Sequence, residues 1–128
     1  IFYLVRKNSI AVYLLLLAIG FANWDTIIAK YNFAHAEKAY VHLSFLSELS
    51  DKALPYLQQP VAKLERVKQE QDLHYGRDKY AMSPTDYTQK IETRISDFVA
   101  EYPERHWLEW NYAEWRAYKM LSTRRVAN

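Results

Sequence analysis

The most hydrophobic stretch of the chain lies near its N-terminus. Residues 10–22, IAVYLLLLAIGFA, contain no charged and no strongly polar side chain, and Asn23, Trp24 and Asp25 follow directly. This length is below the roughly 20 residues that a helix needs to span a bilayer. Counted from Asn8 to Trp24, with flanking side chains that reach the headgroups, the stretch attains the lower end of the spanning range.

The residues on either side of this stretch are typical of a membrane helix. Arg6 and Lys7 precede it, and Trp24 stands at its far end, where aromatic side chains gather at the membrane–water interface. We therefore predict that residues 1–24 hold a last membrane helix with its flank and that residues 25–128 form an extramembrane helical domain. The alternative is a soluble helical domain in which the hydrophobic helix is buried in the core.

The distribution of Lys and Arg bears on the orientation of such a helix. Basic side chains close to one end favour the cytoplasm for that end. Arg6 and Lys7 therefore predict an extracytoplasmic tail on a protein of the cell membrane. Lys30 and Lys38 lie on the other side of the stretch and reduce this asymmetry.

Beyond residue 24, apolar side chains recur at the three- and four-residue steps of amphipathic helices. The clearest helix start is Ser83, an N-cap followed by Pro84 at the first helical position, and Pro103 ends that helix. Its buried face is predicted to carry Tyr87, Ile91, Ile95, Phe98 and Tyr102. Only 2 Gly and 4 Pro disfavour the many tight turns of a β-sandwich. The sequence predicts an all-α fold, a small bundle of about four to six helices. The predicted helices cover residues 25–49, 51–57, 60–75, 83–102 and 106–125.

Composition excludes several kinds of site. Lys and Arg number 17 and Asp and Glu 15, which gives a net charge of +2, and the two signs are interspersed, unlike a nucleic-acid-binding surface. The absence of cysteine excludes disulfides, thiolate metal ligands and a cysteine nucleophile. With 2 glycines there is no glycine-rich phosphate loop. We predict no nucleic-acid partner and no cofactor.

The histidines and acidic residues are weak candidates for chemistry. His35 and His42 are spaced to share a helix face, but the residues between them on that face supply no carboxylate, so a metal site is not expected. His106 and Glu109 could pair as acid and base on neighbouring turns, yet nothing marks a pocket around them. We predict no catalytic residue and no metal-binding residue.

Three stretches of the chain resemble one family. NWDTIIAKYN (23–32), YVHLSFLSELSDKALPYL (40–57) and WLEWNYAEWRA (107–117) are similar, in this order, to the C-terminal part of a family of bacterial multi-pass membrane proteins of unknown function. Trp24 stands where that family commonly has proline. The resemblance implies that residues 1–24 include the end of a membrane domain and that the rest is its extramembrane tail, and it implies no catalytic residue. The residues that carry it are Asn23, Asp25, Ile28, Ala29, Tyr31, Asn32, Leu49, Ser50, Asp51, Ala53 and Pro55. Residues 51–57 also resemble a single helix of a HEAT repeat.

Aromatic residues are unusually frequent, with 11 Tyr, 4 Trp and 5 Phe. Four of them, Trp107, Trp110, Trp115 and Tyr118, would share one face of the last helix. We predict that this aromatic face packs in the core, because each ring buries a large area. The alternative is a surface that stacks on sugars, bases or lipid headgroups, with Arg116 as a neighbouring cation.

Polar residues form the other candidate site. Asn111, among those rings, would need a hydrogen-bond partner, and we predict the Tyr31 hydroxyl or Asn32 for this role. The candidate functional or structural polar cluster comprises Asp25, Tyr31, Asn32, Asn111 and Arg116. A pocket around these residues would favour an accessory domain of a transporter or membrane enzyme whose active site lies in other helices.

The function that these patterns favour is structural or interactive. We predict a non-catalytic extramembrane helical tail of a bacterial integral membrane protein. Its expected partners are the membrane and either its own membrane domain or another protein.

Overall fold

The computed structural model describes residues 2–21, 23–76, 78 and 81–126. The described residues contain helices and no strand, which confirms the predicted all-α fold. The α-helices are α1 (Phe2–Phe21), α2 (Trp24–Ala34), α3 (Leu43–Ser47), α4 (Leu54–Leu57), α5 (Val61–Tyr75), α6 (Pro84–Glu101) and α7 (Tyr112–Val126). Short 3-10 helices are η1 (Asp51–Ala53), η2 (Tyr102–Glu104) and η3 (Trp107–Glu109).

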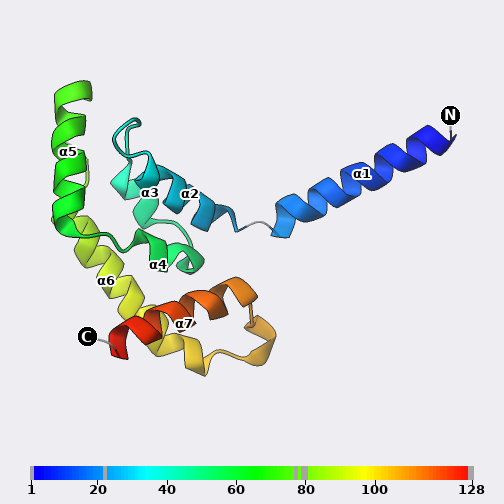
Figure 1. The fold of residues 1–128 in the computed structure, drawn as a ribbon. Helices are drawn as coiled ribbons and strands as arrows, with labels where there is room; N and C mark the ends of the chain where they lie inside the picture. Colours follow the sequence, from blue (N-terminus) through cyan, green and yellow to red (C-terminus); the bar gives the residue numbers. More distant parts are fainter. Residues whose placement is uncertain (1, 22, 77, 79–80, 127–128) are drawn as a thin grey trace.

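The helices after α1 form a bundle, from which α1 projects (Figure 1). Within the bundle α6 contacts α3, α4, α5 and α7, while α2 packs on α4 and η1. The core between these elements is aliphatic at its centre, with Leu46, Leu54, Leu57, Leu64 and Ile91 almost completely buried. The start of α2, the η1 segment and the first turn of α7 lie on the side of the bundle from which α1 projects.

Helix α6 follows its sequence signals closely. The Ser83 hydroxyl accepts a hydrogen bond from the Asp86 amide (3.1 Å), and Pro84 occupies the first turn, where its missing N–H costs nothing. Four of the five residues predicted for its inner face are buried, namely Tyr87, Ile91, Ile95 and Phe98, and Tyr102 is half-buried against the same core. This helix is central to the bundle because it packs on α3, α4, α5 and α7.

The segment predicted as one helix over residues 25–49 is broken, so this prediction was wrong. Helix α2 ends at Ala34, and His35 stacks on Tyr31 with ring centroids 4.2 Å apart. The chain then turns and resumes as α3. The break lets Leu46 and Leu49 fold back into the core, whereas a continuous helix would carry them away from it. Burial thus overrides the helical periodicity.

The last helix was also predicted to be longer than it is. Residues 106–111 form η3 and a connection, and α7 begins only at Tyr112. The Asn111 side-chain oxygen accepts a hydrogen bond from the Ala113 amide (2.9 Å). Asparagine competes in this way with helical hydrogen bonding and favours a helix start over a helix interior.

Tyr87 connects α6 to the end of α4. Its buried hydroxyl donates a hydrogen bond to the Leu57 carbonyl oxygen (3.0 Å), and burial raises the pKa of the Tyr87 phenol above its ordinary range. We expect Tyr87→Phe to lower the free energy of unfolding by about 1–2 kcal/mol, because it leaves a buried carbonyl unpaired. The measurement is urea unfolding of the full chain, followed by circular dichroism.

The same hydroxyl makes stability depend on alkaline pH. Above pH of about 10 the phenol ionises in the unfolded chain while the folded protein retains the proton, so stability falls as pH rises. Tyr87→Phe should lose part of this dependence on alkaline pH. Tyr75→Phe, at an exposed position, should change neither the free energy of unfolding nor its dependence on pH. An unchanged unfolding curve for Tyr87→Phe would contradict this role of the hydrogen bond.

Candidate functional site

The side chains of α1 are not buried by the rest of the described chain. Every described side chain from Arg6 to Ile19 is exposed, including Leu15 at 60% and Leu16 at 62%. The alternative in which residues 10–22 form a core helix is therefore wrong for the described side chains of this stretch. A contiguous exposed apolar surface of this extent is rare on soluble monomers.

The length and hydropathy of each helix bear on whether it could cross a membrane. Among the described residues, no helix taken singly combines the length and the apolar character that a membrane crossing requires. The pair Arg6–Ile19 and Trp24–Ala34 meets the requirement together, with a bend of 66° at the break between the two parts. The second part is α2, whose Ala29 and Phe33 are buried in the bundle.

The junction between α1 and the bundle is fixed by hydrogen bonds. The Trp24 indole N–H donates to the Ile19 carbonyl (2.9 Å), and the Asn23 side chain caps α2 by accepting from the Thr26 amide (3.4 Å). The Asp25 carboxylate accepts from the Ser50 amide (3.1 Å), and the Thr26 hydroxyl donates to the Lys52 carbonyl (3.2 Å). The first turn of α2 is thereby attached to η1.

A groove opens next to this junction, between α2, the η1–α4 segment and α7. It has a volume of about 300 Å³ and begins at Asn23, the cap of α2. Its charged side chains are Lys30, Lys52 and Arg116, and its apolar wall includes Ile27, Tyr56 and Met120. We call this site the basic groove.

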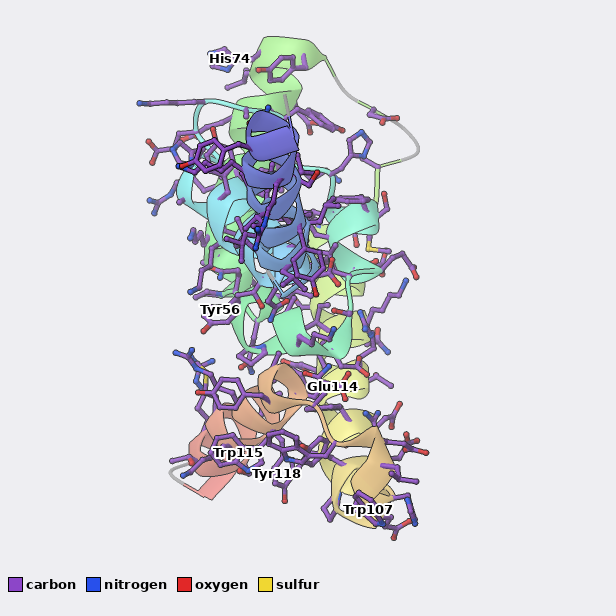
Figure 2. All side chains as sticks on the ribbon, turned by 90° about the vertical axis from the view of Figure 1, so that its right-hand side faces the viewer. Tyr56, His74, Trp107, Glu114, Trp115 and Tyr118 are labelled. Atoms are coloured by element: carbon purple, nitrogen blue, oxygen red, sulfur yellow. The ribbon has the colours of Figure 1, made fainter. Side chains whose placement is uncertain are left out.

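Among the described residues, no acidic side chain forms an ion pair with the cations of the basic groove. The ion pairs among the described residues involve other side chains, and no carboxylate lines the groove. Lys30 places its ammonium 4.3 Å from the centre of the Tyr56 ring, a cation–π contact that holds the charge in place without cancelling it. Tyr56 lies above α7 in the view of Figure 2.

An ion-pair network holds α7 in position beside the groove. Arg94 of α6 donates to the Ser47 carbonyl (2.6 Å) and pairs with the Asp51 carboxylate (2.8 Å). Arg105 lies 3.8 Å from the second oxygen of Asp51 and 2.8 Å from the Glu114 carboxylate on α7. Because these partners come from distant parts of the sequence, no local motif could have indicated them.

The predicted polar cluster is dispersed. Asp25 holds η1, Tyr31 is exposed and stacks on His35, and the Asn32 side chain donates to the Ile28 carbonyl of its own helix (2.9 Å). Asn111 caps α7, and no hydrogen bond among the described residues joins it to Tyr31 or Asn32, contrary to the prediction. Of the five residues, Arg116 lines the basic groove.

The predicted aromatic face is mostly at the surface. Trp107, Trp110 and Trp115 are exposed, the first at 75%, so core packing was wrong for these three. The break before α7 takes Trp107 and Trp110 out of the helical face on which that prediction depended. Tyr118 is half-buried and stacks on Tyr102, with ring centroids 4.7 Å apart. Figure 2 shows Trp115 and Tyr118 on α7 and Trp107 at the far edge of the connection before it.

The two histidines considered for metal binding lie on different elements. His35 places Nδ1 3.0 Å from the Tyr31 carbonyl at the end of α2, and His42 precedes α3 with its ring edge-on to Tyr40. In the part of the chain that the structure describes, no three His, Asp or Glu side chains are grouped so that they could hold a metal ion.

Comparison with known proteins gives one match. Residues 1–59 match a family model described as a domain of unknown function (DUF4153). The match covers α1 to α4, including the junction at Trp24 and one wall of the basic groove. No curated protein and no solved structure matches the chain. The resemblance to an uncharacterised family is thereby supported for this part of the chain.

Arg94 provides a test of the ion-pair network. We expect Arg94→Lys to lower the free energy of unfolding by about 1–2 kcal/mol, because one ammonium cannot serve both the Ser47 carbonyl and the Asp51 carboxylate in the geometry of a guanidinium. Lys90→Gln, which removes a more exposed pair with Glu48, should have little effect. Equal stability of Arg94→Lys and the unaltered chain would show that the Arg94 contacts with Ser47 and Asp51 do not stabilise the bundle.

Proposed function

We propose that this chain is the C-terminal region of a bacterial integral membrane protein, with α1 in the membrane and the bundle of α2 to α7 outside it. The bundle has a structural or protein-interaction role and carries no catalytic site. The observation that supports this function best is the exposed apolar surface of α1, which the rest of the described chain leaves uncovered. In water such a surface is unfavourable, and in lipid it is not.

The dimensions of α1 support its placement. The helix has 20 residues and is therefore about 30 Å long, close to the thickness of the hydrocarbon region. Arg6 and Lys7 lie in its N-terminal half, so the uncharged part is shorter. The Lys7 ammonium reaches back toward the N-terminus and lies 4.6 Å from the centre of the Tyr3 ring. This direction is the one in which a lysine reaches toward the headgroups.

The exposed aromatic residues support a position of the bundle close to the headgroups. Trp24 stands at the base of α1, and Trp107 and Trp110 are exposed in the connection before α7. This connection lies on the side of the bundle from which α1 projects (Figure 1). Tryptophan is enriched at membrane–water interfaces, where its ring is apolar and its N–H is hydrated. The alternative of a stacking surface for lipid headgroups, rather than core packing, thus fits these tryptophans.

Insertion of α1 can be tested by flotation of the full chain with liposomes. We expect Leu14→Lys combined with Leu15→Lys to abolish flotation, because each lysine near the middle of a membrane helix costs about 3 kcal/mol. The matched control adds the same charge at exposed positions of α5, as Gln69→Lys with Leu73→Lys, and should float like the unaltered chain. Equal flotation of both variants would exclude α1 as the membrane element.

The orientation can be tested by cysteine labelling, because the chain has no cysteine. Arg6 and Lys7 favour the cytoplasm for the start of α1, and we therefore propose that the bundle lies on the extracytoplasmic side. We expect Gln69→Cys, at an exposed position of α5, to react with a membrane-impermeant maleimide in intact bacterial cells. Labelling only after lysis would place the bundle in the cytoplasm instead.

A further inference from the structure

We propose that the basic groove binds the phosphate of an anionic phospholipid headgroup. This inference rests on the proposed function, because it requires α1 to bring the groove to the membrane surface. The ligand would be a lipid of the surrounding bilayer rather than a soluble metabolite, and its phosphate would lie between Lys30, Lys52 and Arg116.

The charge of the basic groove is complementary to that of an anionic ligand. Lys30, Lys52 and Arg116 converge on one groove from three elements, and none of them forms an ion pair among the described residues. Elsewhere on the bundle Arg94 and Arg105 are paired with carboxylates. Three unneutralised cations around one cavity favour an anionic ligand, and a phosphate accepts hydrogen bonds from both ammonium and guanidinium groups.

The basic groove lies next to the end of α1. The groove begins at Asn23, immediately after the membrane helix, and includes Thr26 and Ile27 of the first turn of α2. The attachment of Asp25 to the Ser50 amide fixes the η1 wall at the same level. If α1 is in the bilayer, this level is that of the lipid headgroups, where the phosphates are the concentrated anions.

The lining of the basic groove contains both charged and apolar side chains. Ile27, Tyr56 and Met120 supply an apolar wall beside the three cations. A phospholipid has the same division, with a charged phosphate next to the glycerol and the first acyl carbons. A volume of about 300 Å³ is large enough for a headgroup, and a polyanionic macromolecule would not need an apolar wall.

The basic surface also continues along α7. A second hollow of about 440 Å³ shares Arg116 and Met120 with the groove and adds Lys119 and Arg124. The Lys119 ammonium lies 5.1 Å from the centre of the exposed Trp115 ring. This continuation provides room for the rest of a headgroup or for a second one.

The test uses the full chain in a neutral detergent, titrated with monomeric short-chain phosphatidylglycerol. Binding is followed by tryptophan fluorescence, and the same titrations are made with short-chain phosphatidylcholine and with inorganic phosphate. Flotation with purely neutral vesicles measures the insertion of α1 separately. We expect saturable binding of phosphatidylglycerol, much weaker binding of phosphatidylcholine, and no comparable binding of inorganic phosphate.

Two variants with the same loss of charge locate the site. The groove variant is Lys30→Gln, Lys52→Gln and Arg116→Gln, and it should bind phosphatidylglycerol about 10- to 100-fold more weakly. The control variant removes three cations outside the groove, as Lys38→Gln, Arg66→Gln and Lys68→Gln, and should bind like the unaltered chain. Circular dichroism checks that each variant is folded, and Arg116→Gln alone replaces the triple variant if that one loses helicity.

The results of these experiments distinguish the proposed lipid site from the proposed membrane role of α1. Flotation of the groove variant with neutral vesicles, together with its selective loss of phosphatidylglycerol binding, supports the lipid site. Equal weakening in both charge variants, or binding of inorganic phosphate as tight as that of the lipid, overturns it while the membrane role of α1 stands. Failure of the unaltered chain to float overturns the proposed function and, with it, this inference.

Discussion

The apolar surface of α1 has no counterpart in the rest of the described chain. The bundle closes its own core around Leu46, Leu54 and Ile91, and α1 projects away from it (Figure 1). We propose that the free-energy cost of exposing the side chains of α1 to water is removed by something outside this bundle. A bilayer, or the neighbouring helices of a membrane domain, would remove this cost and leave the bundle of α2 to α7 as it is.

The start of α2, η1 and the first turn of α7 form the side of the bundle from which α1 projects (Figure 1). Asp25 attaches the start of α2 to η1, and Asp51 of η1 is in turn paired with Arg94 and lies near Arg105. Arg105 continues the connection to Glu114 at the start of α7. These contacts hold α2, η1 and α7 around a cavity whose cations form no ion pair with any described residue. Stability of the bundle and formation of the basic groove thus depend on the same polar contacts.

Local signals in the sequence were sufficient where a helix starts at a strong cap and carries a regular apolar stripe, as α6 does from Ser83. They failed where burial of Leu46 and Leu49 required a turn after α2, and where Asn111 began a helix that periodicity placed earlier. The groove could not be predicted, because Lys30, Lys52 and Arg116 meet only in the folded chain. Arg116 was predicted as a cation beside the aromatic face and as a member of the polar cluster. Its proximity to Lys30 and Lys52 was not predicted.

The most direct measurement of what covers α1 is the accessibility of a nitroxide on that helix in lipid vesicles. Leu15→Cys and Leu73→Cys each give the chain a single labelling site, both at exposed positions, one on α1 and one on α5. We expect the label at residue 15 to collide freely with dissolved oxygen and to be shielded from a water-soluble nickel complex, with the opposite result at residue 73. A label at residue 15 that is as accessible to the nickel complex as that at residue 73 would contradict the account.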